Sequence, residues 1–256
     1  MCGLAGHFNI FQPSKENPST TLTPRKGVLC LFAKGKFKVR NVRIMSNIYI
    51  GLSGVAGAGK DLFFSLFSKK FNCNRYSLAD ALKKEVSPFS KDSYDIDPLT
   101  CSRKEKNLIR PLLVTHGTIK RDRSKGRHWI DKLNKKIKNN LTNQIVIITD
   151  IRYDDYPKDE VFWLKEELGG HLVHISLYSL IPRLNAYYRS YREPVNAEEE
   201  RNDPKIKSKA DYFIDWQKFD TDRDSKLEPY IDDFIKWLNE KEDGLSAYKK
   251  TEGERL

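Results

Sequence analysis

A chain of 256 residues, 39% hydrophobic and 32% charged, is long enough to bury a substantial core and too apolar to be intrinsically disordered. No apolar run approaches the roughly 18 residues that a membrane span requires, so we expect no membrane partner. Because residues 1–44 carry +7 of the formal net charge of +11, the other 212 residues carry only +4, which suits an enzyme of anionic phosphates better than a stable nucleic-acid binder.

The first segment of the chain, residues 1–44, shows no sustained hydrophobic period. It contains three prolines, a Ser/Thr cluster and the basic run KGKFKVR. We therefore expect a basic, poorly structured N-terminal extension, with Met45 as a natural start of the folded domain. The N-terminus lacks the pattern of a secretory signal, and the four cysteines show no metal-like spacing. These features predict a cytoplasmic protein with reduced thiols, in the host cytoplasm if the chain is viral.

From residue 45 to about residue 242, strand and helix patterns alternate. Buried strands are expected at IYIGLS, QIVIITD, HLVHISLY and ADYFIDW. Amphipathic helices are expected over residues 61–71, near 78–86, over 103–116 and 128–140, up to about 168, and over 225–241. This alternation predicts a three-layer α/β domain with a mostly parallel sheet, followed by a polar C-terminal tail over 243–256.

The segment GLSGVAGAGKD, residues 51–61, has the G-x-x-x-x-G-K pattern of a phosphate-binding loop (P-loop). Gly54, Gly57 and Gly59 would let backbone N–H groups close around phosphate oxygens, because they lack a Cβ atom. Lys60 would reach the β- and γ-phosphates. The strand before the loop and the helix after it favour a phosphate site over a glycine-rich turn.

Two acidic residues are candidate magnesium ligands. Asp61 stands where Ser or Thr normally supplies a hydroxyl to Mg²⁺. It would hold the water shell of the metal, or serve only as an acid in the first helical turn, and the residues alone leave both readings open. Asp150, which closes IVIITD, fits a Walker B acid at the carboxyl edge of the sheet, and Arg152 offers a planar fork to a phosphate. The alternative for that pair is a strand cap beside a solvated arginine.

The segment LIRPLLVTHGTIKRDRSKGRHWIDKL, residues 108–133, concentrates basic side chains around Gly117, Thr118 and Trp129. Most of them fit a solvated helix face. Two or three would suffice to grip a substrate phosphate, and the aromatic residues nearby would be available to stack a base.

Four landmarks in order, GLSGVAGAGKD, SLADALKKEV, RPLLVTHGTIKR…HWIDKL and VIITDIRY…DEVFWLKEELGGHLVHI, resemble the bacteriophage-type deoxynucleoside monophosphate kinases of the P-loop nucleoside monophosphate kinase superfamily. The last strand, ADYFIDW, resembles the closing strand of that family, so the likeness spans about residues 47–240. The family characteristically has Gly-Lys-Asp, which makes Asp61 a family trait. The resemblance implies a P-loop NTPase fold with helical acceptor-binding and lid segments. It implies an enzyme that uses ATP and Mg²⁺ to phosphorylate a deoxynucleoside 5′-monophosphate, and it leaves a homodimer open.

The resemblance also implies roles for individual residues. The donor triphosphate and its metal would be held by Gly54, Gly57, Ala58, Gly59, Lys60, Asp61 and Leu62, with Asp61 and Asp150 as the metal ligands. The acceptor would be held by Asp80, Lys83, Arg110, Gly117, Thr118, Trp129 and Arg152. The catalytic residues would be Lys60, Asp150, Arg152 and Arg121, and residues 182–209 would resemble a lid.

The chain departs from the family pattern at two places. The family usually has Thr where this chain has Leu62, which removes a hydroxyl from the metal site. Its Phe-Pro-Asn-Glu segment is replaced by YDDYPKDE, which leaves the roles of Asp159 and Glu160 open.

A second resemblance concerns the first residues, MCGLAGHFN, which are similar to the start of class II glutamine amidotransferases. In those enzymes a cysteine in the place of Cys2 attacks glutamine. The downstream segments of that domain are absent, and about 44 residues are too few to build it, so we expect no amidotransferase activity.

Three alternatives to the deoxynucleotide kinase stay open. The first is a P-loop kinase of another small acceptor, such as dephospho-coenzyme A. The second is a nucleic-acid-binding or end-phosphorylating P-loop protein, and the third is a catalytically silent P-loop scaffold.

Overall fold

The computed structural model describes residues 47–140, 144–184 and 186–251. The expectations for residues 1–44, including the resemblance around Cys2, lie outside the described residues, as does the end of the predicted tail.

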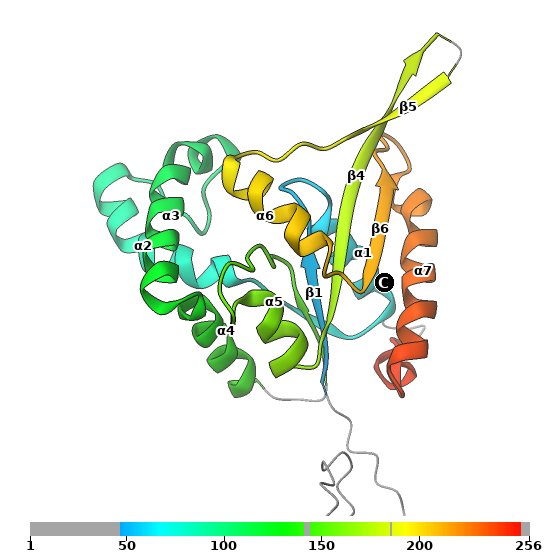
Figure 1. The fold of residues 1–256 in the computed structure, drawn as a ribbon, viewed down its shortest axis with the longest axis horizontal. Helices are drawn as coiled ribbons and strands as arrows, with labels where there is room; N and C mark the ends of the chain where they lie inside the picture. The colour runs from blue at the N-terminus through cyan, green and yellow to red at the C-terminus, as the bar shows by residue number, and fades with distance from the viewer. Residues whose placement is uncertain (1–46, 141–143, 185, 252–256) are drawn as a thin grey trace, which may run out of the picture. The chain divides into compact units, whose positions relative to one another are not determined.

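A mostly parallel sheet forms the centre of the domain (Figure 1). Its parallel strands lie in the order β2 (Cys73–Tyr76), β3 (Ile145–Ile148), β1 (Ile48–Ser53), β4 (His171–Arg183) and β6 (Tyr212–Gln217). The remaining strand, β5 (Ala186–Tyr191), pairs antiparallel with the C-terminal end of β4. The two strands form a hairpin that projects from the sheet. The predicted α/β class with a mostly parallel sheet is confirmed.

Helices cover both faces of this sheet, so the domain has three layers. On one face, α1 (Lys60–Lys70) and α7 (Arg223–Lys241) pack their apolar stripes against β1, β3, β4 and β6. On the other face lie α4 (Arg127–Asn139), the short α5 (Glu160–Phe162) with the π-helical turn Trp163–Glu167, and α6 (Ala197–Lys207). Two more helices, α2 (Leu78–Tyr94) and α3 (Arg103–Ser124), stack beside α4. Strand residues alternate between the two cores, as buried parallel strands must.

The register of β1 against β3 positions the functional site. Gly51 lies beside Ile148 in this parallel pair. The two strands therefore end at the same edge of the sheet, where the P-loop follows β1 and Asp150 follows β3. The motifs are about 100 residues apart in the sequence, and it is the parallel pairing that brings them together.

The structure differs from the predicted elements in several places, and β5 and α6 lie in a stretch where no element was predicted. α3 continues to Ser124 instead of ending near residue 116, and it begins with a capping box between Ser102 and Glu105. The helix predicted to end near residue 168 is reduced to α5 and the π-helical turn, because residues 151–159 form a loop. A 3₁₀ helix, Leu245–Tyr248, continues the folded domain past residue 242, where a polar tail was predicted.

The apolar side chains of this last helix explain the difference. Leu245 and Tyr248 are 1% and 6% exposed and belong to the core cluster formed with α1 and α7. Within the described residues, no helix combines the length and the apolar character that crossing a bilayer demands.

Candidate active site

The P-loop is held in shape by positive backbone φ angles and by close packing. Gly54 and Gly59 have φ angles of 120° and 104°, a region that side-chain-bearing residues rarely adopt. A Cβ atom on Gly54 would lie 2.2 Å from the carbonyl oxygen of Ile175, and one on Gly59 would lie 2.5 Å from the ring of Trp216. The indole Nε1 of Trp216 also donates to the carbonyl oxygen of Ala58 at 2.8 Å. The loop therefore has little freedom to change its shape.

This conformation leaves backbone donors available to an anion. In the part of the chain that the structure describes, the amides of Gly57 and Gly59 donate to no protein acceptor. Both lie next to the N-terminus of α1, where the helix dipole adds positive potential. The arrangement has the donors that a phosphate chain needs.

Lys60 turns its ammonium back onto the loop. Its Nζ donates to the carbonyl oxygens of Gly54 at 2.5 Å and Val55 at 2.9 Å, and the residue is only 9% exposed. Burial, followed by repulsion from Arg152, lowers the pKa of Lys60 to about 8. An anion bound in the loop would favour the charged ammonium and would reverse part of this shift.

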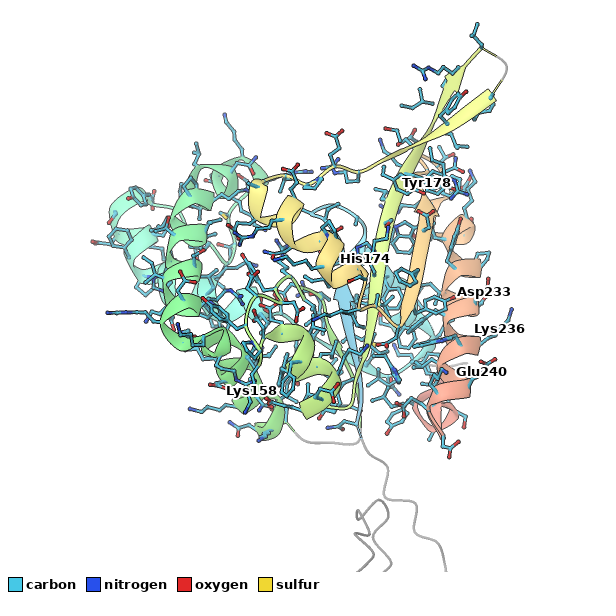
Figure 2. The ribbon with its side chains drawn as sticks, viewed as in Figure 1. Lys158, His174, Tyr178, Asp233, Lys236 and Glu240 are labelled. Atoms are coloured by element: carbon cyan, nitrogen blue, oxygen red, sulfur yellow. The ribbon has the colours of Figure 1, made fainter. Side chains whose placement is uncertain are left out.

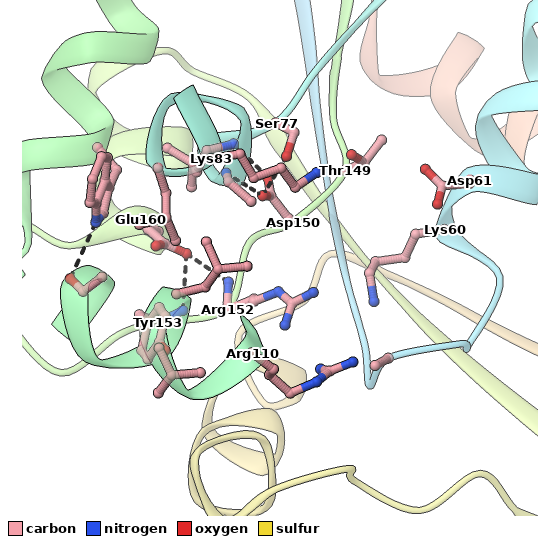
Figure 3. Close-up of a pocket in the computed structure, with 18 of the residues that line it drawn as sticks. Lys60, Asp61, Ser77, Lys83, Arg110, Thr149, Asp150, Arg152, Tyr153 and Glu160 are labelled. Carbon is pink, nitrogen blue, oxygen red and sulfur yellow. Dashed lines mark hydrogen bonds between the residues drawn. The ribbon is translucent and has the colours of Figure 1, made fainter. Parts of the chain in front are cut away.

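Asp150 anchors the N-terminus of α2. Its Oδ2 accepts hydrogen bonds from the Ser77 hydroxyl at 2.7 Å and the Ala79 amide at 2.8 Å, and its Oδ1 accepts from the Leu78 amide at 2.8 Å (Figure 3). The carboxylate is therefore fixed at the edge of the sheet by three donors.

Asp61 sits at the first turn of α1 in a more open position. Its Oδ1 pairs with Arg75 of β2 at 3.0 Å, and its side chain is 82% exposed. Asp61 and Asp150 line the same cavity and offer carboxylate oxygens, the ligands that Mg²⁺ prefers together with waters and substrate phosphates. Among the described residues, no cluster of three or more His, Cys, Asp or Glu forms a metal site by itself. The two carboxylates thus fit a Mg²⁺ ion whose other ligands are waters and the phosphates of a bound nucleotide.

A cavity of about 470 Å³ runs from the P-loop to the helices beside α4. Its volume is within the range of pockets that hold small molecules and cofactors. It is lined by most of the predicted site residues, namely Gly57, Gly59, Lys60, Asp61, Leu62, Lys83, Arg110, Gly117, Thr118, Arg121, Trp129, Asp150 and Arg152. Figure 3 shows the guanidinium groups of Arg110 and Arg152 both extending toward the side of the cavity that holds Lys60.

Three predicted residues do not line the cavity. Gly54 and Ala58 lie in the loop behind its lining residues, and Ala58 is fully buried. Asp80 lies on α2 beside Lys83, with 3.8 Å between Oδ1 and Nζ. Trp129 contributes to the wall but is only 4% exposed, and its Nε1 donates to the carbonyl oxygen of Gly117 at 3.3 Å. The indole therefore shapes the wall more than it offers a free face for stacking.

One face of α3, which we call the acceptor face, forms the far wall of the cavity. It consists of Lys106, Arg110, Leu113, Gly117 and Arg121. These residues follow one another at intervals of three or four, so they share one side of the helix. Counting back one turn from Arg110 would have found Lys106, which the sequence analysis missed.

Lys106 is an unpaired cation at the solvent-accessible rim of the cavity. Within the described residues it has no carboxylate or other hydrogen-bond acceptor. Partial burial, followed by repulsion from Lys83, Arg110 and Arg152, lowers the pKa of Lys106. Among the described residues, the side chain of Arg110 donates a hydrogen bond only to the neutral side chain of Asn107, at 3.1 Å. Unpaired positive charges gathered around a cavity are typical of an anion site.

Arg121, which was predicted to be catalytic, forms ion pairs with two buried carboxylates. Its guanidinium makes a bidentate contact with Asp159 at 2.8 and 3.0 Å, and it donates to Glu160 at 3.3 Å. One face of the guanidinium lies 3.7 Å from the ring centroid of Tyr153. The side chain is 6% exposed, so we assign Arg121 a positioning role instead of contact with a phosphate.

Asp159 and Glu160, whose roles the sequence left open, both have structural roles in this network. Asp159 caps α5 and neutralises Arg121. Glu160 accepts from the backbone amides of Arg152 at 2.7 Å and Tyr153 at 3.1 Å. Burial raises the pKa of Glu160, and the Arg121 charge opposes that rise. Together these residues hold the loop that presents Arg152 to the cavity.

Sequence reasoning also missed Trp216 and Glu199. Both lie far along the chain from the P-loop that they contact, and no local pattern marks either of them. Only the placement of β6 and α6 at this edge of the sheet makes them part of the site.

Searches of protein-family models and of curated protein sequences find no match to this chain. Among solved structures, the dephospho-CoA kinase from Campylobacter jejuni is similar at 13% sequence identity and a TM-score of 0.39. The similarity covers 75% of this chain and 98% of that protein. A likeness this low has no weight for fold or function.

Proposed function

We propose that this chain is a Mg²⁺-dependent kinase that transfers the γ-phosphoryl group of ATP to a deoxynucleoside 5′-monophosphate. The observation that carries the proposal is the single cavity with two chemically different ends. One end has the P-loop with Lys60, and the other has the acceptor face with unpaired cations. The four landmark motifs support the choice of a deoxynucleotide as the acceptor.

The reaction that these residues support is a direct displacement. An oxygen of the acceptor phosphate forms a bond to the γ-phosphorus, the bond from that phosphorus to the bridging β–γ oxygen breaks, and ADP leaves with the electron pair. The acceptor is already an anion, so no general base is needed. Lys60, Arg152 and Arg110 surround the region between the two ends and would offset charge on the transferring group.

Asp61 and Asp150 would hold the magnesium ion. When bound, Mg²⁺ would neutralise the donor phosphates and orient them. Asp150 is held in place by three donors, and its Oδ1 accepts only one of them, from the Leu78 amide, so that oxygen would have a further acceptor position for the ion or its water. Asp61 has one carboxylate oxygen that carries no bond to Arg75.

The acceptor end would bind the monophosphate through Lys106, Arg110 and Lys83. An apolar wall beside them would take the sugar and base, formed by Leu82, Leu113 and Val114. The ring of Tyr153 also lines this end and is held in place by Arg121.

The test is an ADP-release assay with ATP and Mg²⁺, run with each deoxynucleoside and ribonucleoside monophosphate. Dephospho-coenzyme A and an oligonucleotide with a free 5′-hydroxyl are included as acceptors. We expect turnover with one or a few deoxynucleoside monophosphates, and we expect it to be lost in Lys60→Ala. Turnover only with dephospho-coenzyme A or the oligonucleotide would instead establish one of the alternatives, and ATP binding without turnover on any acceptor would indicate a silent scaffold.

A further inference from the structure

A carboxylate from α6 occupies part of the P-loop. The Oε2 atom of Glu199 accepts a hydrogen bond from the Ala56 amide at 3.1 Å and another from the Val195 amide at 3.2 Å. Its Oε1 accepts from the Arg152 guanidinium at 3.0 Å. The side chain is only 9% exposed. The contact joins positions 143 residues apart in the sequence, so it exists only because α6 packs here.

The segment that leads into α6 covers the loop beside Glu199. The guanidinium of Arg192 lies against Gly57, where a Cβ atom would meet it at 3.3 Å, and its Nε donates to the carbonyl oxygen of Ala56 at 3.4 Å. Residues 192–199 therefore place a cation and an anion on the backbone of the P-loop. This segment belongs to the region predicted to form a lid.

The two halves of α6 are held in different ways. In its second half, Ile206 is 2% exposed in the core, and Asp203 pairs at 3.2 Å with the buried His174 of β4 (Figure 2). In its first half, Glu199 is fixed by polar contacts to the loop, to Arg152 and to the cap at Asn196. Polar contacts of this kind exchange for water or ligand more readily than a packed core does.

We propose that Glu199 is a gate for the donor site, an internal anion that takes the place of a phosphate oxygen at the Ala56 amide and must leave before a nucleoside triphosphate can bind. The carboxylate bonds to a backbone N–H of the loop and to an arginine, which are the partners that a phosphate oxygen uses. The inference deepens the proposed kinase function and depends on it for the identity of the ligand.

Release of Glu199 would also free Arg152. While the gate is closed, the arginine has a carboxylate partner and its charge is neutralised. Once phosphates displace Glu199, the guanidinium loses that partner and can pair with the phosphoryl group instead. Donor binding would thus release the arginine that the transfer requires.

The gate predicts that the wild-type protein binds ATP more weakly than a protein without the carboxylate. A binding-competent form that is only partly populated reduces the apparent affinity by that fraction. We expect Glu199→Gln to bind ATP roughly tenfold more tightly, because the neutral amide is a weaker partner for Ala56 and Arg152. The matched control is Glu198→Gln, the preceding residue, which pairs with the exposed Arg201 at 2.8 Å and does not contact the loop.

The experiment has two arms on the full chain. The first compares amide hydrogen exchange at Ala56 in the nucleotide-free wild type, Glu199→Gln and Glu198→Gln. We expect faster exchange only in Glu199→Gln, and equal exchange in all three would show that the contact is absent and overturn the gate. The second arm titrates ATP, and separately inorganic tripolyphosphate, by calorimetry.

The titrations separate failure of the gate from failure of the kinase proposal. Tighter binding of both ligands by Glu199→Gln alone supports the gate. Equal or weaker binding by that variant overturns it, even if the enzyme is an active kinase. If no protein binds ATP, the kinase proposal fails, and tripolyphosphate then decides the gate by the same comparison. Absence of tripolyphosphate binding by any of the proteins would also overturn the gate.

Discussion

The two ends of the cavity differ in how their charges are satisfied without a ligand. At the proposed donor end, several groups that could bind phosphate already have partners within the protein. Glu199 accepts from the Ala56 amide and from Arg152, and Lys60 donates to loop carbonyls. At the acceptor end, Lys106 and Arg110 have no carboxylate partner within the described residues. Arg152 beside the P-loop is thus neutralised by Glu199, whereas the end formed by α3 keeps unpaired positive charge within the described residues.

If the proposed function is right, the two substrates would bind to sites of different character. On the proposed function, a donor nucleotide would have to displace Glu199, and the loss of its contacts would offset part of the binding free energy. An acceptor phosphate meets cations that gain a partner for the first time, and their mutual repulsion is relieved. Four variants or conditions test this contrast, starting with the largest effect.

Removing the ammonium at the donor end has the largest expected effect. We expect Lys60→Ala to lower kcat/KM about 1,000-fold, because a preorganised donor to the transferring phosphoryl group is lost in a water-poor site. The measurement is ADP release at saturating acceptor. Lys69→Ala is the control, since within the described residues this lysine of the same helix makes only an exposed ion pair, with Asp224. Comparable losses in the two variants would contradict a specific role for Lys60.

Substitution of Arg121 should have the next largest effect, and the quantity that changes is the free energy of unfolding. Arg121→Leu leaves the carboxylates of Asp159 and Glu160 buried without a counter-ion, which costs about 3–5 kcal/mol in the free energy of unfolding. Urea denaturation measures this loss. Arg127→Leu, which breaks more exposed pairs with Asp131 and Glu167, is expected to cost at most about 1 kcal/mol. A small loss in Arg121→Leu would argue that this arginine is free to bind substrate instead.

Removing one unpaired charge at the acceptor end should change only acceptor binding. We expect Lys106→Gln to raise the KM for the acceptor roughly tenfold, since one charge-assisted contact to the phosphate is lost, and to leave the Kd of ATP unchanged. Lys104→Gln removes an exposed lysine of the same helix that does not line the cavity, and it serves as the control. An equal effect on ATP binding would show that the two ends are not separate sites.

Raising the pH should weaken donor binding by a smaller factor. The pKa of Lys60 in the free protein is lowered to about 8, below its ordinary value of 10.5, so the ammonium loses its proton as the pH rises through 8. Phosphates favour the charged form, and affinity for ATP should fall roughly fivefold between pH 7 and pH 8.6, with proton uptake on binding. Calorimetry in buffers of different ionisation enthalpy measures both quantities.

The same shift has a consequence for stability with the opposite sign. Between about pH 8 and 10.5, the unfolded chain binds more protons at this lysine than the folded protein does, so Lys60 should make the folded state relatively more stable as the pH rises. For the binding prediction, an ATP affinity that does not change across pH 8 would contradict the lowered pKa of Lys60.

Local patterns were enough to predict the strands and the glycine-rich loop at the proposed donor site. The spacing of Gly54, Gly59 and Lys60 between a strand and a helix indicated the P-loop, and the β-branched run before Asp150 indicated the neighbouring strand. The parallel pairing of β1 with β3 then brought the two motifs to one edge of the sheet, as expected for this class of fold.

The partners of these residues could not be predicted from the sequence. Arg121 lies in a basic run and reads as a substrate contact, because nothing local shows that Asp159 and Glu160 pack against it. Glu199 is one of three successive acids at the start of a helix, and only the position of α6 distinguishes it from Glu198 and Glu200. Such contacts depend on tertiary packing, which no short sequence pattern encodes.

The most direct test of the proposed kinase activity follows the γ-phosphoryl group of ATP. ATP labelled at the γ-phosphate is incubated with the full chain, Mg²⁺ and each deoxynucleoside 5′-monophosphate, and the products are separated by chromatography. We expect label in the β-position of a deoxynucleoside diphosphate, and transfer about 1,000-fold slower with Lys60→Ala. Label that appears only as inorganic phosphate, or only on an acceptor other than a nucleoside monophosphate, would contradict it.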